Sequence, residues 1–430
     1  MPEDTSETTP PVEGSSLRQR AARAGVWIVA VKAVQRSLGL VRMVVLARLL
    51  SPAEFGVYGF ASLAIAFLDM FTETGADISV IRRKETGRDY LDTVWTLQFL
   101  RSLGLFLALV AGAGLVGWFF KSPRSTDLLR LLAFSVLIRG CTSVGVVCLR
   151  KELKYKALFP FSFGNSVADL LVTAVLAWWL RSAWALVGGV LAGQLAGCII
   201  SYMIHPYRPR FRMHARYLKE LYHFGRWIFS QSFLFYFLTE GDKIILGRLL
   251  GSLPLGLYQM AFRVSNMPTT EIMHVVSRIT LPAYASLRES LPRLRSVYLD
   301  TIQMIALLSS PLAAGLVCVA PSLTHCILGA AWVPATRAIQ VLALFGFIRS
   351  VSANSGSFFY TIGRPDIVTK LMLGKVVLMA VMIVPMTLLF GMMGTVATMT
   401  LNALAAKPVT DYLVIRGLKC SARDMVYPQV

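Results

Sequence analysis

Apolar residues form long runs along this chain, and short polar junctions separate them. Each run has the length of about 20 residues that crosses the hydrocarbon core as a helix. Helices are required there because unpaired backbone groups cannot face lipid. The pattern therefore predicts an all-α polytopic membrane protein with twelve transmembrane helices. The expected runs are 24–50, 55–80, 92–118, 128–149, 159–180, 183–204, 227–250, 254–277, 301–325, 338–360, 368–390 and 392–415.

Basic residues gather at every second junction, for example 82–88, 150–156 and 208–226, and the alternate junctions hold few. Loops rich in Lys and Arg stay on the cytoplasmic side of a membrane, so both termini are expected to be cytoplasmic. The net charge of +20 is then explained by orientation and by contact with anionic membrane lipids. No nucleic-acid partner is expected, because spanning segments interrupt the basic patches.

The two halves of the chain repeat each other. With a shift of 200 residues, 46–61 aligns with 246–261 without a gap, and Gly56 meets Gly256. An even number of helices per half makes the copies parallel, as in transporters whose two bundles rock about a central site. The expected domains are a disordered cytoplasmic tail (1–16), an N-terminal six-helix bundle (17–204), a basic cytoplasmic linker (205–226), a C-terminal six-helix bundle (227–416) and a cytoplasmic tail (417–430).

Several charged residues lie inside the apolar runs. A charge at mid-bilayer is unfavourable by about 2.5–3.5 kcal/mol, so each should face water or a partner. Helical spacing places Lys32, Arg36 and Arg42 on one face of the first helix. Lys32 lies at a depth similar to that of Asp69 and Glu73 on the second helix, which predicts an ion-pair network.

A cross-bundle pair is a second hypothesis, since Asp242 occupies the position that the repeat assigns to Arg42. Such a pair would act as a gate between the two bundles.

Arg139 and Arg349 lie near the middle of their helices, and a shift of 210 residues superposes them. Guanidinium groups bind phosphate through two parallel hydrogen bonds and stay charged. Together with Arg36 and Arg42, they are therefore candidate contacts for an anionic head group in a central cavity. Buried structural pairing is the alternative for Arg139 and Arg349, as is snorkelling toward the membrane surface.

Motifs for catalysis are absent from the sequence. It contains no GxxxxGK[ST] motif for ATP. The five histidines lack metal-ligand spacing, and no nucleophile–base constellation stands out. We therefore expect neither an enzyme nor a protein with a metal or cofactor.

Two segments carry a family resemblance. LARLLSPAEFGVYGFASLAIAFLDMFTETGADISVIRRKE (46–85) and GAAWVPATRAIQVLALFGFIRSVSANSGSFFYTIGRPDI (329–367) resemble the bacterial polysaccharide transporters, which are Wzx-like oligosaccharide flippases. They belong to the multidrug/oligosaccharidyl-lipid/polysaccharide (MOP) superfamily, whose drug exporters include the MATE proteins. In the second segment, Arg349 is part of the family pattern.

The resemblance implies two MATE-like six-helix bundles in the bacterial inner membrane that work by alternating access. The substrate would be an undecaprenyl-pyrophosphate-linked oligosaccharide, moved to the periplasmic leaflet for exopolysaccharide, capsule or O-antigen synthesis. A polysaccharide polymerase and a chain-length regulator would be partners. Two alternatives remain at this point: an ion-coupled drug exporter of the same superfamily, and a non-transporting scaffold of a polysaccharide synthase complex.

Overall fold

The computed structural model describes residues 13–70, 87–152, 154–213, 215–418 and 420. Side chains are described from 25 onward, except at 215–232, 274–275, 277–279 and 281. Within these ranges all regular structure is helical. The elements are α1 (Glu13–Leu49), α2 (Pro52–Met70), α4 (Arg88–Phe119), α5 (Pro123–Gly140), α6 (Gly145–Lys151), α7 (Tyr155–Leu180), α8 (Trp184–Ile204), α9 (Ala215–Leu250), α10 (Ser252–Ser286), α11 (Leu291–Ser322), η1 (Leu323–Leu328), η2 (Ala330–Ala335), α12 (Thr336–Thr361), α13 (Pro365–Phe390) and α14 (Met392–Leu418).

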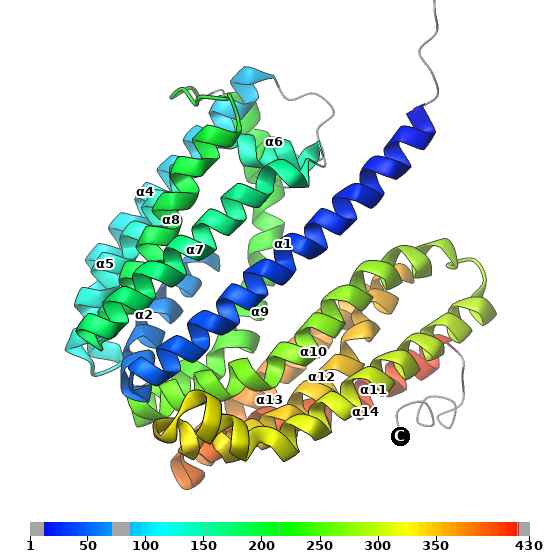
Figure 1. The fold of residues 1–430 in the computed structure, drawn as a ribbon. Coiled ribbons are helices and arrows are strands. Elements are labelled where there is room, and N and C mark those ends of the chain that lie inside the picture. The colour runs from blue at the N-terminus through cyan, green and yellow to red at the C-terminus, as the bar shows by residue number, and fades with distance from the viewer. Residues whose placement is uncertain (1–12, 71–86, 153, 214, 419, 421–430) are drawn as a thin grey trace, which may run out of the picture.

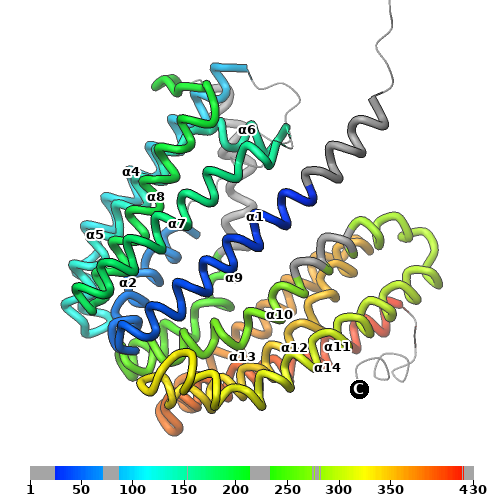
Figure 2. The backbone as a smooth tube through the Cα atoms, in the orientation of Figure 1, coloured from blue at the N-terminus to red at the C-terminus, as the bar shows by residue number. Residues whose placement is uncertain are grey.

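The helices form two bundles that meet at one end and diverge at the other (Figure 1). The N-terminal bundle holds α1 to α8, and the C-terminal bundle holds α9 to α14. We call the junction of the bundles, where α1 ends and α2 and α10 begin, the closed end. The opposite end, which carries α6 and the turn between α10 and α11, is the open end. The same separation is visible in the backbone trace (Figure 2).

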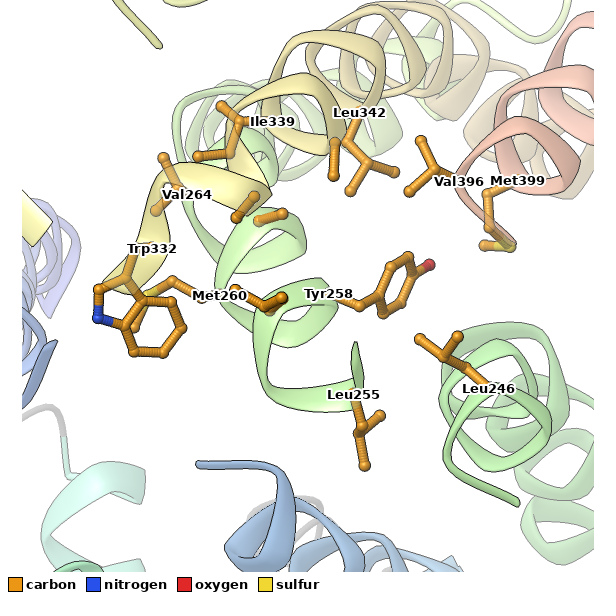
Figure 3. Close-up of a cluster of buried hydrophobic side chains, with 14 of the residues drawn as sticks. Leu246, Leu255, Tyr258, Met260, Val264, Trp332, Ile339, Leu342, Val396 and Met399 are labelled. Carbon is orange, nitrogen blue, oxygen red and sulfur yellow. The ribbon is translucent and has the colours of Figure 1, made fainter. Parts of the chain in front are cut away.

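A hydrophobic core joins the two bundles at the closed end. The N-terminal bundle contributes Met43 and Phe60, and the C-terminal bundle contributes the larger share. Figure 3 shows the centre of this cluster, where Tyr258 and Trp332 are fully buried. The indole N–H of Trp332 donates to the carbonyl oxygen of Ala47 at 2.8 Å, which ties η2 to the end of α1.

Two repeat-related glycines allow the bundles to approach closely. A Cβ atom added to Gly56 would lie 1.8 Å from the carbonyl oxygen of Ser252, and one added to Gly256 would lie 1.8 Å from that of Pro52. Neither position has room for any side chain, because the obstacle is backbone. The in-register Gly56/Gly256 match of the sequence repeat thus marks the crossing of α2 and α10.

Two further repeat mates, Arg48 and Arg248, reach from one bundle to the other at the closed end. The Nε of Arg48 donates to the carbonyl oxygen of Ile327 in η1 at 2.8 Å, and Nη2 donates to that of Cys326. Arg248 lies over the ring of Phe119 of α4, 5.5 Å from its centroid. One arginine thus reaches from the N-terminal bundle to the C-terminal bundle, and its repeat mate reaches the other way. This is the arrangement expected when the two halves are related by an approximate two-fold axis.

The predicted apolar runs fall on helices, except for 71–80 of the second run, which lies outside the described residues, so the all-α membrane fold is confirmed. By length and composition, seven helices among the described residues are apolar enough to span a membrane, or eight if the bent pair α5–α6 is one span. The number twelve and the cytoplasmic position of the termini remain predictions.

The run 128–149 is broken, because the chain bends by 58° between α5 and α6. Side chains of two other helices donate to carbonyl oxygens at the break: Gln98 to those of Arg139 and Gly140, and Tyr202 to that of Cys141 at 2.6 Å.

The expected domain boundaries remain a prediction, and two helices begin inside the segments expected to be a tail and a linker. α1 begins at Glu13, inside the tail expected to be disordered, and α9 begins at Ala215, inside the expected linker. The non-helical part, 205–213, is attached to α4. The Tyr207 hydroxyl donates to buried Asp92 at 2.5 Å, and burial together with this bond raises the pKa of Tyr207. This hydrogen bond attaches the non-helical part of the linker to the N-terminal bundle.

Candidate functional site

A cavity of about 450 Å³ lies between the two bundles. Its volume falls in the range of ligand pockets, about 300–1,000 Å³. Helices of both bundles line it, namely α1 on one side and α9, α10 and α12 on the other. The lining residues are Gln35, Arg36, Gly39, Leu40, Met43, Lys243, Gln259, Phe262, Arg263, Asn266, Met267, Thr270 and Arg349.

Three guanidinium groups of the cavity lie at similar depth. A helix rises about 1.5 Å per residue. Counted from the closed end, Arg36 lies about 20 Å along α1, Arg263 about 16 Å along α10 and Arg349 about 20 Å along α12. A hydrocarbon core is about 30 Å thick, so distances of about 16–20 Å from the closed end are compatible with a position inside it.

Arg349 has no carboxylate partner among the described residues. Its Nη2 donates to the hydroxyl of Thr270 at 2.7 Å, and its guanidinium lies 5.8 Å from the ring centroid of Phe345. Its Nε is buried without a hydrogen-bond acceptor. A buried charged donor without an acceptor is unfavourable, which is the state expected of a side chain whose acceptor is a ligand.

Arg263 projects from α10 into the same cavity and is exposed there. In the described part of the chain it forms no ion pair. Lys243 also lines the cavity, but Glu240 of its own helix binds its ammonium group at 2.7 Å. Arg36 is paired with Glu271. Of the four cations that line the cavity, Arg36 and Lys243 are therefore paired with carboxylates, whereas Arg263 and Arg349 form no ion pair within the described part of the chain.

The predicted set of substrate contacts is only partly brought together. Arg36 and Arg349 line the cavity, whereas Arg42 and Arg139 are not among its lining residues. Arg42 is paired with Asp169 of α7, 3.1 Å away, and Arg139 with Asp69 of α2. Both pairs lie within the N-terminal bundle, which is the structural pairing that the sequence left open for Arg139.

The proposed Arg42–Asp242 gate does not form in this structure. Asp242 is fully buried in the C-terminal bundle, where it accepts a hydrogen bond from the hydroxyl of Tyr258. Arg42 has its own carboxylate, Asp169, on the N-terminal side of the interface. Arg42 and Asp242, which the repeat aligns, thus each interact with a residue of their own bundle.

The expected network of Lys32 with Asp69 or Glu73 is described only in part. Asp69 pairs with Arg139, and a Lys32–Asp69 ion pair is not among those of the described residues. Glu73 lies outside the described residues, so its interactions remain a prediction.

Sequence reasoning did not select Arg263 or Glu271. A signal for Arg263 exists, since Gln259, Arg263, Asn266 and Thr270 recur at helical spacing on α10. They form a polar stripe within a run that is otherwise mainly apolar, and all four line the cavity.

Comparison with known proteins places the chain among membrane transporters. The family model "Polysaccharide biosynthesis protein" matches residues 45–337. The chain is 24% identical over 400 residues to the lipopolysaccharide biosynthesis protein WzxC of Escherichia coli, covering 93% of this chain and 80% of that protein. These findings confirm the resemblance drawn from the sequence.

Solved structures share the fold. The lipid II flippase MurJ in an inward closed conformation superposes with a TM-score of 0.74 at 14% identity, covering 94% of this chain and 90% of MurJ. An inward-facing MATE multidrug transporter of the MOP superfamily gives 0.69 at 16% identity, covering 90% of this chain and 95% of that one. Relatives and neighbours are transporters and flippases, not enzymes. The chain belongs to the polysaccharide biosynthesis protein family, and it shares the fold of MurJ and of the MATE transporter.

Proposed function

We propose that the protein is a lipid-linked oligosaccharide flippase of the bacterial inner membrane. It moves undecaprenyl-pyrophosphate-linked repeat units from the cytoplasmic to the periplasmic leaflet by alternating access, for exopolysaccharide, capsule or O-antigen assembly. The observation that carries the proposal is that two guanidinium groups of the cavity between the bundles, those of Arg263 and Arg349, form no ion pair with a described carboxylate. A diphosphate diester carries one negative charge on each phosphate, so the two charges match.

The orientation follows from the basic junctions. Arg150, Lys151 and the arginines of 205–213 lie toward the open end (Figure 1). By the positive-inside rule this end is cytoplasmic, as are both termini. The cavity then opens toward the compartment in which sugar nucleotides are used to build lipid-linked units. Head group and first sugars occupy the cavity while the polyprenyl chain stays in lipid.

The alternative of a drug exporter fits the cavity less well. Exporters of cationic drugs need a site that attracts positive charge, and Arg263 and Arg349 repel it in low dielectric. The synthase scaffold remains the second alternative. A scaffold needs no unpaired cations in a cavity between the bundles, so this alternative does not explain Arg263 and Arg349.

Deletion of the gene tests the proposal in cells. We expect surface polymer to fall to background and lipid-linked repeat units to accumulate on the cytoplasmic side, because synthesis continues while translocation stops. Quantified surface polysaccharide and extracted lipid-linked oligosaccharide are the measurements, and re-expression of the full chain is the control. Normal surface polymer in the deleted strain, or loss of polymer without accumulation of the lipid-linked unit, contradicts the proposal.

A further inference from the structure

Among the interior ion pairs of the described residues, the pair between Arg36 and Glu271 is the one that joins the two bundles. Arg36 belongs to α1, and Glu271 to α10. Arg42–Asp169 and Arg139–Asp69 connect helices of the N-terminal bundle only, and Lys243–Glu240 lies within α9. Breaking Arg36–Glu271 therefore changes how the bundles are held together, which breaking the other pairs does not.

The pair lies at the edge of the cavity that faces the open end. Glu271 directly follows Thr270, the last residue of α10 that lines the cavity, and α10 runs from the closed end toward the open end. About half of each side chain is exposed, at 47% for Arg36 and 43% for Glu271. A ligand that enters from the open end can therefore reach the guanidinium while Glu271 still holds it.

A negatively charged ligand can compete with Glu271 for Arg36. A head group held by Arg263 and Arg349 brings phosphate oxygens to the cavity whose wall includes Arg36. Phosphate and carboxylate both bind guanidinium in the same two-bond geometry, so they compete for it. An ion pair in contact with water contributes little net stability, and a charged ligand can displace one partner.

We propose that Glu271 is a positioning residue that couples head-group binding to movement of the bundles, a proposal that rests on the proposed function. The diphosphate takes Arg36 from Glu271 and so releases the bridge between α1 and α10. Departure of the head group on the other side lets the pair form again. Ligand binding shifts a conformational equilibrium only through different interactions in the two states, and this exchange of partners supplies such a difference.

The experiment measures binding of inorganic pyrophosphate to the purified full chain in lipid nanodiscs by titration calorimetry. We expect Glu271→Gln to bind pyrophosphate about tenfold more tightly than the wild type, since Arg36 no longer has a competing carboxylate. In a protein that already carries Arg36→Gln, the additional change Glu271→Gln should leave the affinity for pyrophosphate unchanged. A variant that is damaged in its fold does not bind pyrophosphate more tightly. Tighter binding by Glu271→Gln would therefore show that Glu271 competes for Arg36 and does not merely support the fold.

Two controls accompany it. Asp127→Asn removes one negative charge from an exposed pair on α5, away from the cavity, and should leave the affinity unchanged. The conservative change Glu271→Asp keeps the carboxylate but shortens the side chain, so its affinity for pyrophosphate should lie between those of the wild type and Glu271→Gln. If Glu271→Gln misfolds, Glu271→Asp carries the test, and an affinity equal to that of the wild type overturns the proposal.

The outcomes distinguish the two proposals. A wild type that binds pyrophosphate, with Glu271→Gln equal to it, overturns the role of Glu271 and leaves the flippase intact. A wild type that does not bind pyrophosphate, even at millimolar concentration, overturns the flippase and with it the role of Glu271.

Discussion

Replacing Arg349 by Ala is expected to reduce surface polysaccharide at least about tenfold at equal protein level. A charged hydrogen bond contributes about 1.5–3 kcal/mol, and each 1.4 kcal/mol corresponds to a factor of ten. Arg349 has no described carboxylate partner, so its removal leaves no orphaned carboxylate among the described residues. The loss should therefore appear in transport rather than in folding.

Two variants show whether the chemistry of Arg349 matters. Arg349→Lys keeps the charge but loses the two-bond geometry, so we expect an intermediate level of polymer. Arg130→Ala removes an exposed arginine of α5 that pairs with Asp127 on the same helix, and it should export normally. Undiminished polymer in Arg349→Ala would remove this residue from the site.

Gly256→Ala is expected to destabilise the protein strongly and to abolish export. The added Cβ would lie 1.8 Å from the carbonyl oxygen of Pro52, so the helices α2 and α10 must separate. Overpacking of this kind is unfavourable by about 1–3 kcal/mol. The separation also opens the hydrophobic contact at the closed end, about which the proposed rocking of the bundles takes place.

Thermal unfolding of the purified protein and export in cells are the measurements. Gly104→Ala is the matched control, since a Cβ at this position in α4 meets nothing within 4 Å. Alanine is the better helix former by about 1 kcal/mol, so this control should keep or raise the unfolding temperature. Equal unfolding temperatures for Gly256→Ala and Gly104→Ala would show that the glycine crossing does not hold the bundles together.

The architecture was predictable because it depends on patterns that repeat along the chain. Apolar run lengths and the repeat of 46–61 at 246–261 predicted helices and two related halves. The glycines and arginines that match in register in these segments, such as Gly56 and Gly256, form the closed end. The break between α5 and α6 was not predictable from hydropathy, because Gln98 and Tyr202, which satisfy its carbonyl groups, come from α4 and α8.

The positive charge of the cavity wall was predictable from the sequence, but the ion pairs of the arginines were not. Mid-helix position selected Arg349 and Arg36, which line the cavity. It also selected Arg139, but the structure places Arg139 in the last turn of α5, next to the bend toward α6, and not in the middle of a helix. Asp69 neutralises Arg139 because α2 packs against α5. The repeat that aligns Arg139 with Arg349 gives no information about this packing.

Translocation in reconstituted vesicles tests the central claim most directly, namely that Arg263 and Arg349 bind the diphosphate during transport. The substrate is a fluorescent polyprenyl-diphosphate oligosaccharide, compared with the same polyprenyl chain and sugars joined without phosphate. We predict that the wild type moves the diphosphate compound across the bilayer and leaves the neutral one behind. Replacement of both arginines by Gln should abolish that movement. Equal rates for the two compounds, or an unchanged rate in the doubly substituted protein, would contradict the account.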